Sequence, residues 1–118
     1  MCHVLIIEDE VLVALDLQDL LGGLGATTFA FAETQADAIE AARDRRPDFI
    51  TSDVVLLEGT GPEAVATILC ELGPVPVIFI TGTPEACSPC RPPARVLSKP
   101  LHYPAITSAF REMAPLPG

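Results

Sequence analysis

Residues 3–10, His3-Val4-Leu5-Ile6-Ile7-Glu8-Asp9-Glu10, join an uninterrupted apolar run to three consecutive acids. A continuous run of branched aliphatic residues is typical of a strand that is buried on both faces, as the strands of parallel sheets are. The acids close the run and place carboxylates where the strand ends. This stretch therefore predicts a parallel sheet with a charged strand end.

Strand-like and helix-like patterns alternate along the rest of the chain. Further strands are expected at residues 27–31, 49–52, 76–80 and 95–98. Apolar residues at helical spacing predict helices over Val13–Leu24, Thr34–Arg46, Pro62–Leu72 and Ile106–Met113, the first ended by its run of glycines. Between Thr83 and Ala94, four prolines allow at most a short or irregular fourth helix. The pattern predicts an α/β fold, a doubly wound (βα)5 unit around a parallel five-stranded sheet.

Polar residues follow four of these strands. In sheets of this kind, ligands bind at the carboxyl ends of the strands, so residues far apart in sequence are expected to share one site. They are Glu8, Asp9, Glu10, Asp53, Thr81 and Lys99. Several carboxylates at one edge repel one another, and Mg²⁺, which prefers oxygen ligands and shares phosphate oxygens, would relieve that repulsion. A carboxylate there can accept a phosphoryl group, while a lysine and a hydroxyl receive its oxygens.

Composition narrows the classes of partner. The chain has 118 residues, a formal net charge of −9 and seven basic residues, of which Lys99 is the only lysine. This acidic balance argues against a nucleic-acid partner. Neither a signal peptide nor an apolar run long enough for membrane insertion is visible, so we expect a cytoplasmic protein with reduced cysteines and a single domain over residues 1–118.

The polar strand ends resemble the receiver domain of bacterial two-component response regulators over essentially the whole chain. The resemblance implies a flavodoxin-like strand order 2-1-3-4-5. It also implies that Asp53 is the phospho-acceptor, with Mg²⁺ as the cofactor. The implied metal ligands are Asp9, Asp53 and the backbone carbonyl of Val55, with Glu8 acting through water.

The resemblance also implies which residues bind the phosphoryl group and how the signal is passed on. By the same resemblance, Thr81 and Lys99 bind the phosphoryl oxygens, and the bond before Pro100 is cis. A histidine kinase or histidine phosphotransfer protein is the implied donor. Such a domain is no enzyme beyond its own phosphorylation and dephosphorylation, and it passes the signal on by protein contact or phosphate relay. We expect a monomer or weak dimer without an effector domain; the downstream target stays unnamed.

Two features depart from the family pattern. Three residues before the lysine, the family usually has an aromatic switch residue, and here Val96 stands there. The proline-rich segment 83–94 replaces a full fourth helix. The Phe79-Ile80-Thr81-Gly82 sequence and the weak fourth helix look similar to those of a subset of receivers, often stand-alone proteins or partners in stress signalling, that lack the aromatic switch.

Two other classes of protein remain as alternatives. A haloacid-dehalogenase-like phosphatase also uses a strand-end Asp, a Thr and a Lys, but it needs a second Asp where Val55 stands. A pseudo-receiver would bind partners without phosphorylation, which the Val96 departure favours and the intact acidic set opposes.

Three smaller features have ordinary interpretations. Cys87 and Cys90 have the spacing of a zinc or redox pair, but no second pair exists, so we interpret them as incidental loop cysteines. Glu10 is interpreted as an acid that complements the helix dipole. Val11, Leu12 and Leu15 are either core residues or, as in the family, contacts for the phosphodonor.

Overall fold

The computed structural model describes residues 2–82 and 94–114 of the chain. In those residues it contains five strands and four helices, in the order β1 (His3–Ile7), α1 (Val11–Gly23), β2 (Thr28–Ala32), α2 (Gln35–Asp44), β3 (Phe49–Ser52), α3 (Gly61–Leu72), β4 (Val77–Thr81), β5 (Arg95–Ser98) and α4 (Tyr103–Met113). The strands form one parallel sheet in the order β2-β1-β3-β4-β5. The predicted fold class and strand order are confirmed. The prediction for residues 83–93, including Cys87 and Cys90, falls outside the described residues.

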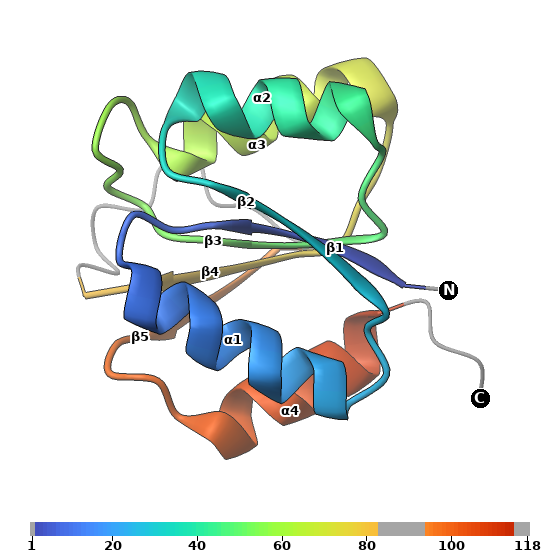
Figure 1. The fold of residues 1–118 in the computed structure, drawn as a ribbon, viewed down its shortest axis with the longest axis vertical. Coiled ribbons are helices and arrows are strands. Elements are labelled where there is room, and N and C mark those ends of the chain that lie inside the picture. Colours follow the sequence, from blue (N-terminus) through green and yellow to red (C-terminus); the bar gives the residue numbers. More distant parts are fainter. Residues whose placement is uncertain (1, 83–93, 115–118) are drawn as a thin grey trace.

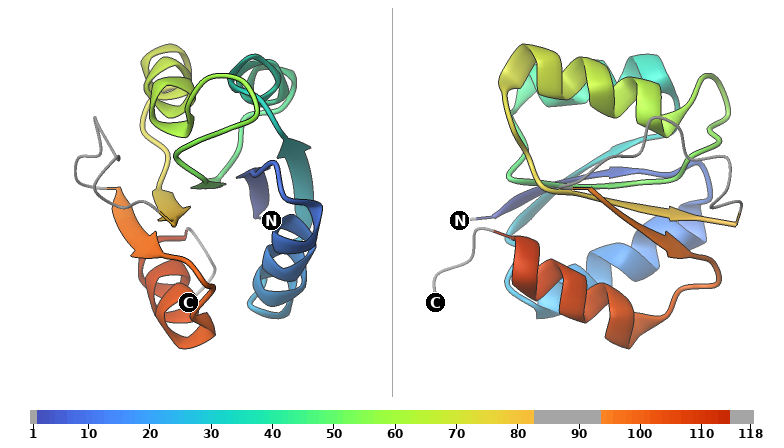
Figure 2. Two further views of the ribbon diagram at one scale, coloured as in Figure 1. Left: turned by 90° about the vertical axis from the view of Figure 1, so that its left-hand side faces the viewer. Right: turned by 180° about the vertical axis from the view of Figure 1, so that it is seen from behind.

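Helices cover both faces of the sheet. In Figure 1, α2 and α3 lie on one side of the strands and α1 and α4 on the other, and Figure 2 shows the same layers from the end and from behind. Each layer has its own core. Leu5, Ile50 and Phe79 face α2 and α3. On the opposite face, Phe49 meets Phe110 of α4 edge to face, with ring centroids 4.9 Å apart.

The helix boundaries show which local signals hold. The α2 helix begins after a capping residue: Thr34 Oγ1 accepts a hydrogen bond from the Asp37 backbone N–H at 3.1 Å. The prediction that the glycines end the first helix is wrong for Gly22 and Gly23, which lie inside α1. Leu21, fully buried, holds this last turn against the sheet. The helix ends at Gly23 with Leu24 as its C-cap, and Gly25 follows with a φ of 117°.

Strand register brings the predicted site residues to one edge of the sheet. Ile7 pairs with Ser52 and Thr81 pairs with Ser98, so Glu8, Asp53 and Lys99 each follow a paired strand end. In Figure 1 these ends lie at the left-hand edge, where β1 turns into α1 and β3 turns into the loop before α3. The prediction placed Thr81 just beyond β4, but it is the last residue of that strand, because its backbone still pairs with β5.

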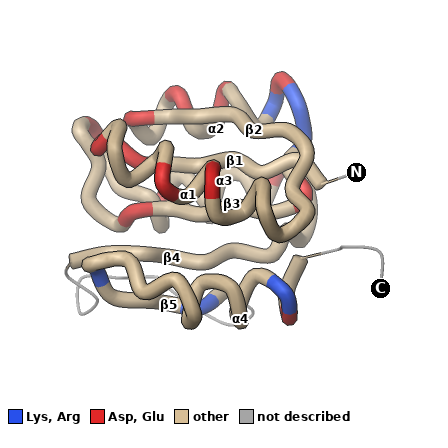
Figure 3. The backbone as a smooth tube through the Cα atoms, turned by 60° about the horizontal axis from the view of Figure 1, so that its bottom comes forward, with Lys and Arg blue, Asp and Glu red and all other residues tan. Residues whose placement is uncertain are grey.

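The charged residues that the structure describes form no single basic face. Figure 3 shows acidic positions on several elements and basic positions in separate short stretches. Among residues 2–82 and 94–114, no helix combines the length and the apolar character needed to cross a bilayer.

Candidate functional site

Asp53, the predicted phospho-acceptor, is buried immediately after β3. Its backbone N–H donates to the Ile7 carbonyl at 2.9 Å, which continues the β1–β3 ladder by one residue. One carboxylate oxygen, Oδ1, accepts a hydrogen bond from the Val54 N–H at 2.7 Å. The other, Oδ2, lies 3.0 Å from Lys99 Nζ. Backbone and side chain are therefore fixed, and a nucleophile in this position is preorganised.

The three acids that follow β1 lie together at the same edge. One carboxylate oxygen from each of Glu8, Asp9 and Glu10 lies within 4.8 Å of the others. Glu8 is buried, and its Oε2 accepts a hydrogen bond from the Glu10 N–H at 3.1 Å. An all-carboxylate donor set of this kind suits a hard divalent cation such as Mg²⁺.

Lys99 joins the two groups of acids. Its Nζ lies 2.9 Å from Glu8 Oε1, 3.0 Å from Asp53 Oδ2 and 3.7 Å from Glu10 Oε1. The ammonium group therefore sits between the end of β1 and the end of β3, reached from the end of β5. One positive charge partly balances at least two buried carboxylates, which leaves the cluster short of positive charge.

The pKa values report this imbalance. Burial raises the pKa of Glu8 to about 7, and the hydrogen bond from Lys99 only partly opposes it. Burial alone would lower the pKa of Lys99, but its hydrogen bonds to Glu8 and Asp53 outweigh burial and hold that pKa well above the ordinary value. A divalent cation at this edge would favour the ionised form of Glu8.

The other predicted positions lie at the ends of β4 and β5. Thr81 is buried, and its carbonyl accepts the Lys99 N–H at 2.8 Å, so the two predicted phosphoryl-binding residues are in direct backbone contact. The Lys99–Pro100 bond is cis, the isomer that the resemblance implied. Val96 lies on β5 with 37% of its surface exposed. No aromatic ring can turn inward from that position.

Val55 lies in the loop between β3 and α3. Its side chain is exposed, and an isolated bridge to Thr60 sets its backbone conformation. The chain therefore keeps the backbone of this residue ordered two positions after Asp53, where a carbonyl ligand was predicted. That Val55, Asp9 and Asp53 ligate a metal stays a prediction.

Some features of the site were not anticipated. Ser52 Oγ donates to the Asp53 carbonyl at 2.7 Å. A Cβ atom on Gly61 would lie 1.8 Å from that same carbonyl oxygen, so only glycine lets α3 begin this close to Asp53. Glu10, interpreted from the sequence as a helix-dipole residue, lies in the acid cluster, at the sheet edge where the sequence already placed it. The Gly59-Thr60-Gly61 sequence was the one available signal of close backbone packing.

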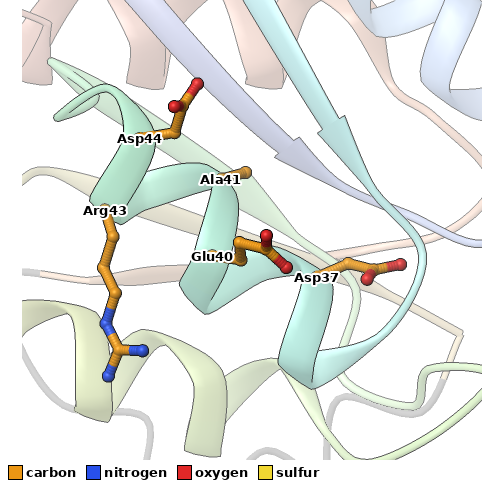
Figure 4. A pocket seen from close by; sticks show the side chains of 5 residues that line it. All are labelled: Asp37, Glu40, Ala41, Arg43 and Asp44. Atoms are coloured by element: carbon orange, nitrogen blue, oxygen red, sulfur yellow. The ribbon is translucent and has the colours of Figure 1, made fainter.

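A hollow of about 650 Å³ lies along α2 and is not part of this site. It is lined by Asp37, Glu40, Ala41, Arg43 and Asp44. In Figure 4 the Arg43 side chain points away from these acids toward α3. There it pairs with Glu71, with nitrogen–oxygen distances of 2.6 and 2.7 Å. These are exposed charges that link two helices, and such links add little stability.

Known proteins share both this sequence and this fold. The family model described as the response regulator receiver domain matches residues 4–90. The chain is 40% identical over 115 residues to the phyllosphere-induced regulator PhyR of Methylorubrum extorquens, an alignment that covers 95% of this chain and 43% of that protein. The chain thus spans less than half the length of this relative.

Solved structures agree with the sequence matches. The receiver domain of Erythrobacter litoralis PhyR has a TM-score of 0.86 and 33% identity, over 99% of this chain and 95% of that one. PhyR from Brucella abortus has a TM-score of 0.83 and 28% identity, over 96% of this chain and 47% of that one. These matches favour a signalling receiver over the phosphatase and the pseudo-receiver. Fold, strand-end chemistry and sequence together show that the chain belongs to the response regulator receiver domain family.

Proposed function

We propose that this receiver accepts a phosphoryl group on Asp53 with Mg²⁺ as its cofactor. The observation that carries the proposal is the position of Lys99 Nζ, 3.0 Å from the Asp53 carboxylate and 2.9 Å from that of Glu8. A cation held beside a buried carboxylate is what a transferred phosphoryl group requires, because negative charge spreads over its equatorial oxygens.

The donor of that group is a phosphohistidine. An Asp53 carboxylate oxygen attacks phosphorus, the phosphorus–nitrogen bond breaks, and its electron pair returns to the imidazole ring of the donor. Lys99 then exchanges its bond to Asp53 Oδ2 for one to a phosphoryl oxygen. The Thr81 hydroxyl donates to a second oxygen. Bound Mg²⁺ supplies positive charge for the phosphoryl oxygens, and Asp9, Asp53, the Val55 carbonyl and, through water, Glu8 would hold it.

The rim of the site suits a protein donor. Leu12 is 78% exposed, and Val11 and Leu15 are also exposed, so these α1 residues are not core. Val55 and Leu57 expose apolar side chains from the loop after β3. Apolar groups around a charged centre are typical of a protein contact surface. We infer that a histidine kinase or phosphotransfer protein in the cytoplasm docks here, and that the signal leaves by protein contact or phosphate relay.

Intact-mass spectrometry tests this function. The chain is incubated with Mg²⁺ and a small-molecule phosphodonor, and the expected product gains one phosphoryl group. Asp53→Asn removes the nucleophile and is expected to abolish the adduct, while Asp48→Asn, at the opposite end of β3, is the matched control and keeps it. An unmodified wild type, or an undiminished adduct in Asp53→Asn, contradicts the proposal.

A further inference from the structure

The loop between Asp53 and α3, residues 54–60, is closed on itself. The Gly61 N–H donates to the Val54 carbonyl at 2.9 Å, and the Leu56 N–H donates to the Gly59 carbonyl at 3.3 Å. Since the Val54 N–H also donates to Asp53 Oδ1, the loop and the acceptor carboxylate form one hydrogen-bonded unit. Any displacement of the loop therefore reaches the acceptor.

This loop is anchored to α2, an element that contributes no group to the acidic cluster. Gln35 Oε1, at the first residue of α2, accepts the Thr60 N–H at 3.1 Å. The Gln35 backbone N–H donates in turn to the Glu58 carbonyl at 3.0 Å. In Figure 1 the start of α2 and this loop lie at the same end of the molecule as the strand ends. A single residue thus makes two hydrogen bonds to the loop.

The packing at Gly59 shows that this contact is tight. A Cβ atom at that position would lie 2.4 Å from Gln35 Oε1 and 2.6 Å from Gln35 Cβ. Gly59 also has a φ of 80°, which side-chain-bearing residues rarely adopt. Loop and glutamine are therefore fitted to each other, and the amide oxygen has one defined place.

We propose that Gln35 is a positioning residue: through Thr60 it holds the loop that carries Val55, and thereby sets the acceptor and the metal-facing backbone. The inference rests on the proposed function for its chemistry, although the anchoring contact does not. Among the residues that the structure describes, no hydrogen bond or ion pair links Gln35 to Asp53 or to the acids after β1, so the loop is its route to the site. Its loss is expected to loosen Mg²⁺ binding more than it lowers the stability of the fold.

Two substitutions separate hydrogen bonding from packing. Gln35→Met keeps the length of the side chain but removes the acceptor oxygen, whereas Gln35→Glu keeps an oxygen that can accept the Thr60 N–H. Gln18→Met, at another half-buried helical glutamine, is the matched control. The Mg²⁺ concentration for half-maximal rise in melting temperature gives the affinity without phosphorylation, and intact mass gives the phosphorylation rate.

Gln35→Met is expected to need about two- to tenfold more Mg²⁺ for the half-maximal rise in melting temperature. This factor corresponds to the free energy of one neutral hydrogen bond. Gln35→Glu and Gln18→Met should stay close to the wild type. Amide hydrogen exchange of residues 54–60 should quicken in Gln35→Met alone. Equal behaviour of the Met and Glu variants, or unchanged loop exchange in Gln35→Met, overturns the positioning role. A wild type that gains no phosphoryl group overturns the proposed function instead, and the exchange experiment still tests Gln35.

Discussion

The two ends of the sheet each bury a titratable side chain, an acid at the carboxyl end and a base at the amino end. At the carboxyl end, Glu8 lies among further acids and is balanced by one lysine. At the amino end, His3 is buried on β1, with Nδ1 2.9 Å from Thr28 Oγ1. Burial raises the pKa of Glu8 to about 7 and lowers that of His3. Both shifts favour the neutral side chain, but they act on stability in opposite directions as the pH changes.

The difference separates function from structure within one sheet. Backbone groups at the amino end are satisfied locally: the His3 N–H donates to Asp48 Oδ2 at 2.8 Å, and Arg46 donates to the Leu72 and Pro74 carbonyls. At the carboxyl end, several acids share one ammonium group. Such a cluster costs stability, and a chain retains it where its charge does chemistry. We therefore expect substitutions at the two ends to fail in different ways.

The largest effect is expected for Gly61→Ala at the carboxyl end. The new methyl group would lie 1.8 Å from the Asp53 carbonyl oxygen and 2.3 Å from Ser52 Oγ, so α3 or Asp53 must move. Overpacking of this kind costs about 3 kcal/mol in the free energy of unfolding, and phosphorylation should be lost with it. Gly23→Ala is the control, because nothing lies within 4 Å of its Cβ position. Urea unfolding of both variants measures the difference; equal stabilities would mean that the junction is looser than described.

A smaller effect is expected for Lys99→Met. Removing the ammonium group leaves Glu8 and Asp53 without their shared cation, which would cost several kcal/mol if both stayed charged. Because the pKa of Glu8 is about 7, this carboxyl can take up a proton instead, so we expect a loss of about 2 kcal/mol at pH 8 and less at pH 6. Lys99→Arg keeps the charge as a control. Denaturant unfolding at the two pH values checks the trend, and a larger loss at pH 6 would contradict it.

Much of this molecule could be predicted from local sequence patterns. The apolar run before Glu8, and the sequence Phe49-Ile50-Thr51-Ser52 before Asp53, predict two strands and the placement of the acids that follow them. Position in a parallel sheet then brings Lys99 to the same edge. The anchoring of residues 54–60 by Gln35 could not be predicted, because it depends on where α2 begins relative to a loop 19 or more residues later in the sequence. Side-chain to backbone bonds of that kind leave no periodic signal.

The prediction that Gly22 and Gly23 end the first helix failed for a related reason. Glycine lowers helix propensity by about 1 kcal/mol, which favours ending the helix there. Burial of Leu21 outweighs that preference, and such tertiary packing is invisible to local propensity. Glu10 is a similar case. An acid is favoured both at the start of a helix and in a cluster that holds a cation, so the residue type alone could not distinguish these two roles.

The smallest predicted effect lies at the amino end and is a dependence on pH. Folding holds the pKa of His3 below its ordinary value, first through burial and then through Arg45, while Asp48 and the Thr28 contact oppose the shift. Between the ordinary pKa of about 6.5 and the lower folded value, the unfolded chain therefore binds the proton more tightly. The contribution of His3 to stability is present above pH 6.5 and is lost as the pH falls through the folded value. Glu8 changes stability in the other direction over an overlapping range, because its carboxyl takes up a proton in the folded state first.

A comparison of two histidine variants isolates this contribution. His3→Gln keeps a hydrogen-bonding group but does not titrate, and His102→Gln, at the exposed second histidine of the chain, is the matched control. The melting temperature of each protein is measured at pH 7.5 and at pH 5.5. Glu8 contributes equally to the change in all three proteins, so its contribution cancels in the comparison. On acidification, we expect the melting temperature of His3→Gln to fall less, or rise more, than that of the wild type or of His102→Gln. This difference should be smaller than the stability loss caused by either substitution at the carboxyl end. If the melting temperatures of His3→Gln and the wild type change equally on acidification, the titration of His3 does not affect folding. The pH dependence of stability then comes from Glu8 at the carboxyl end and not from the amino end.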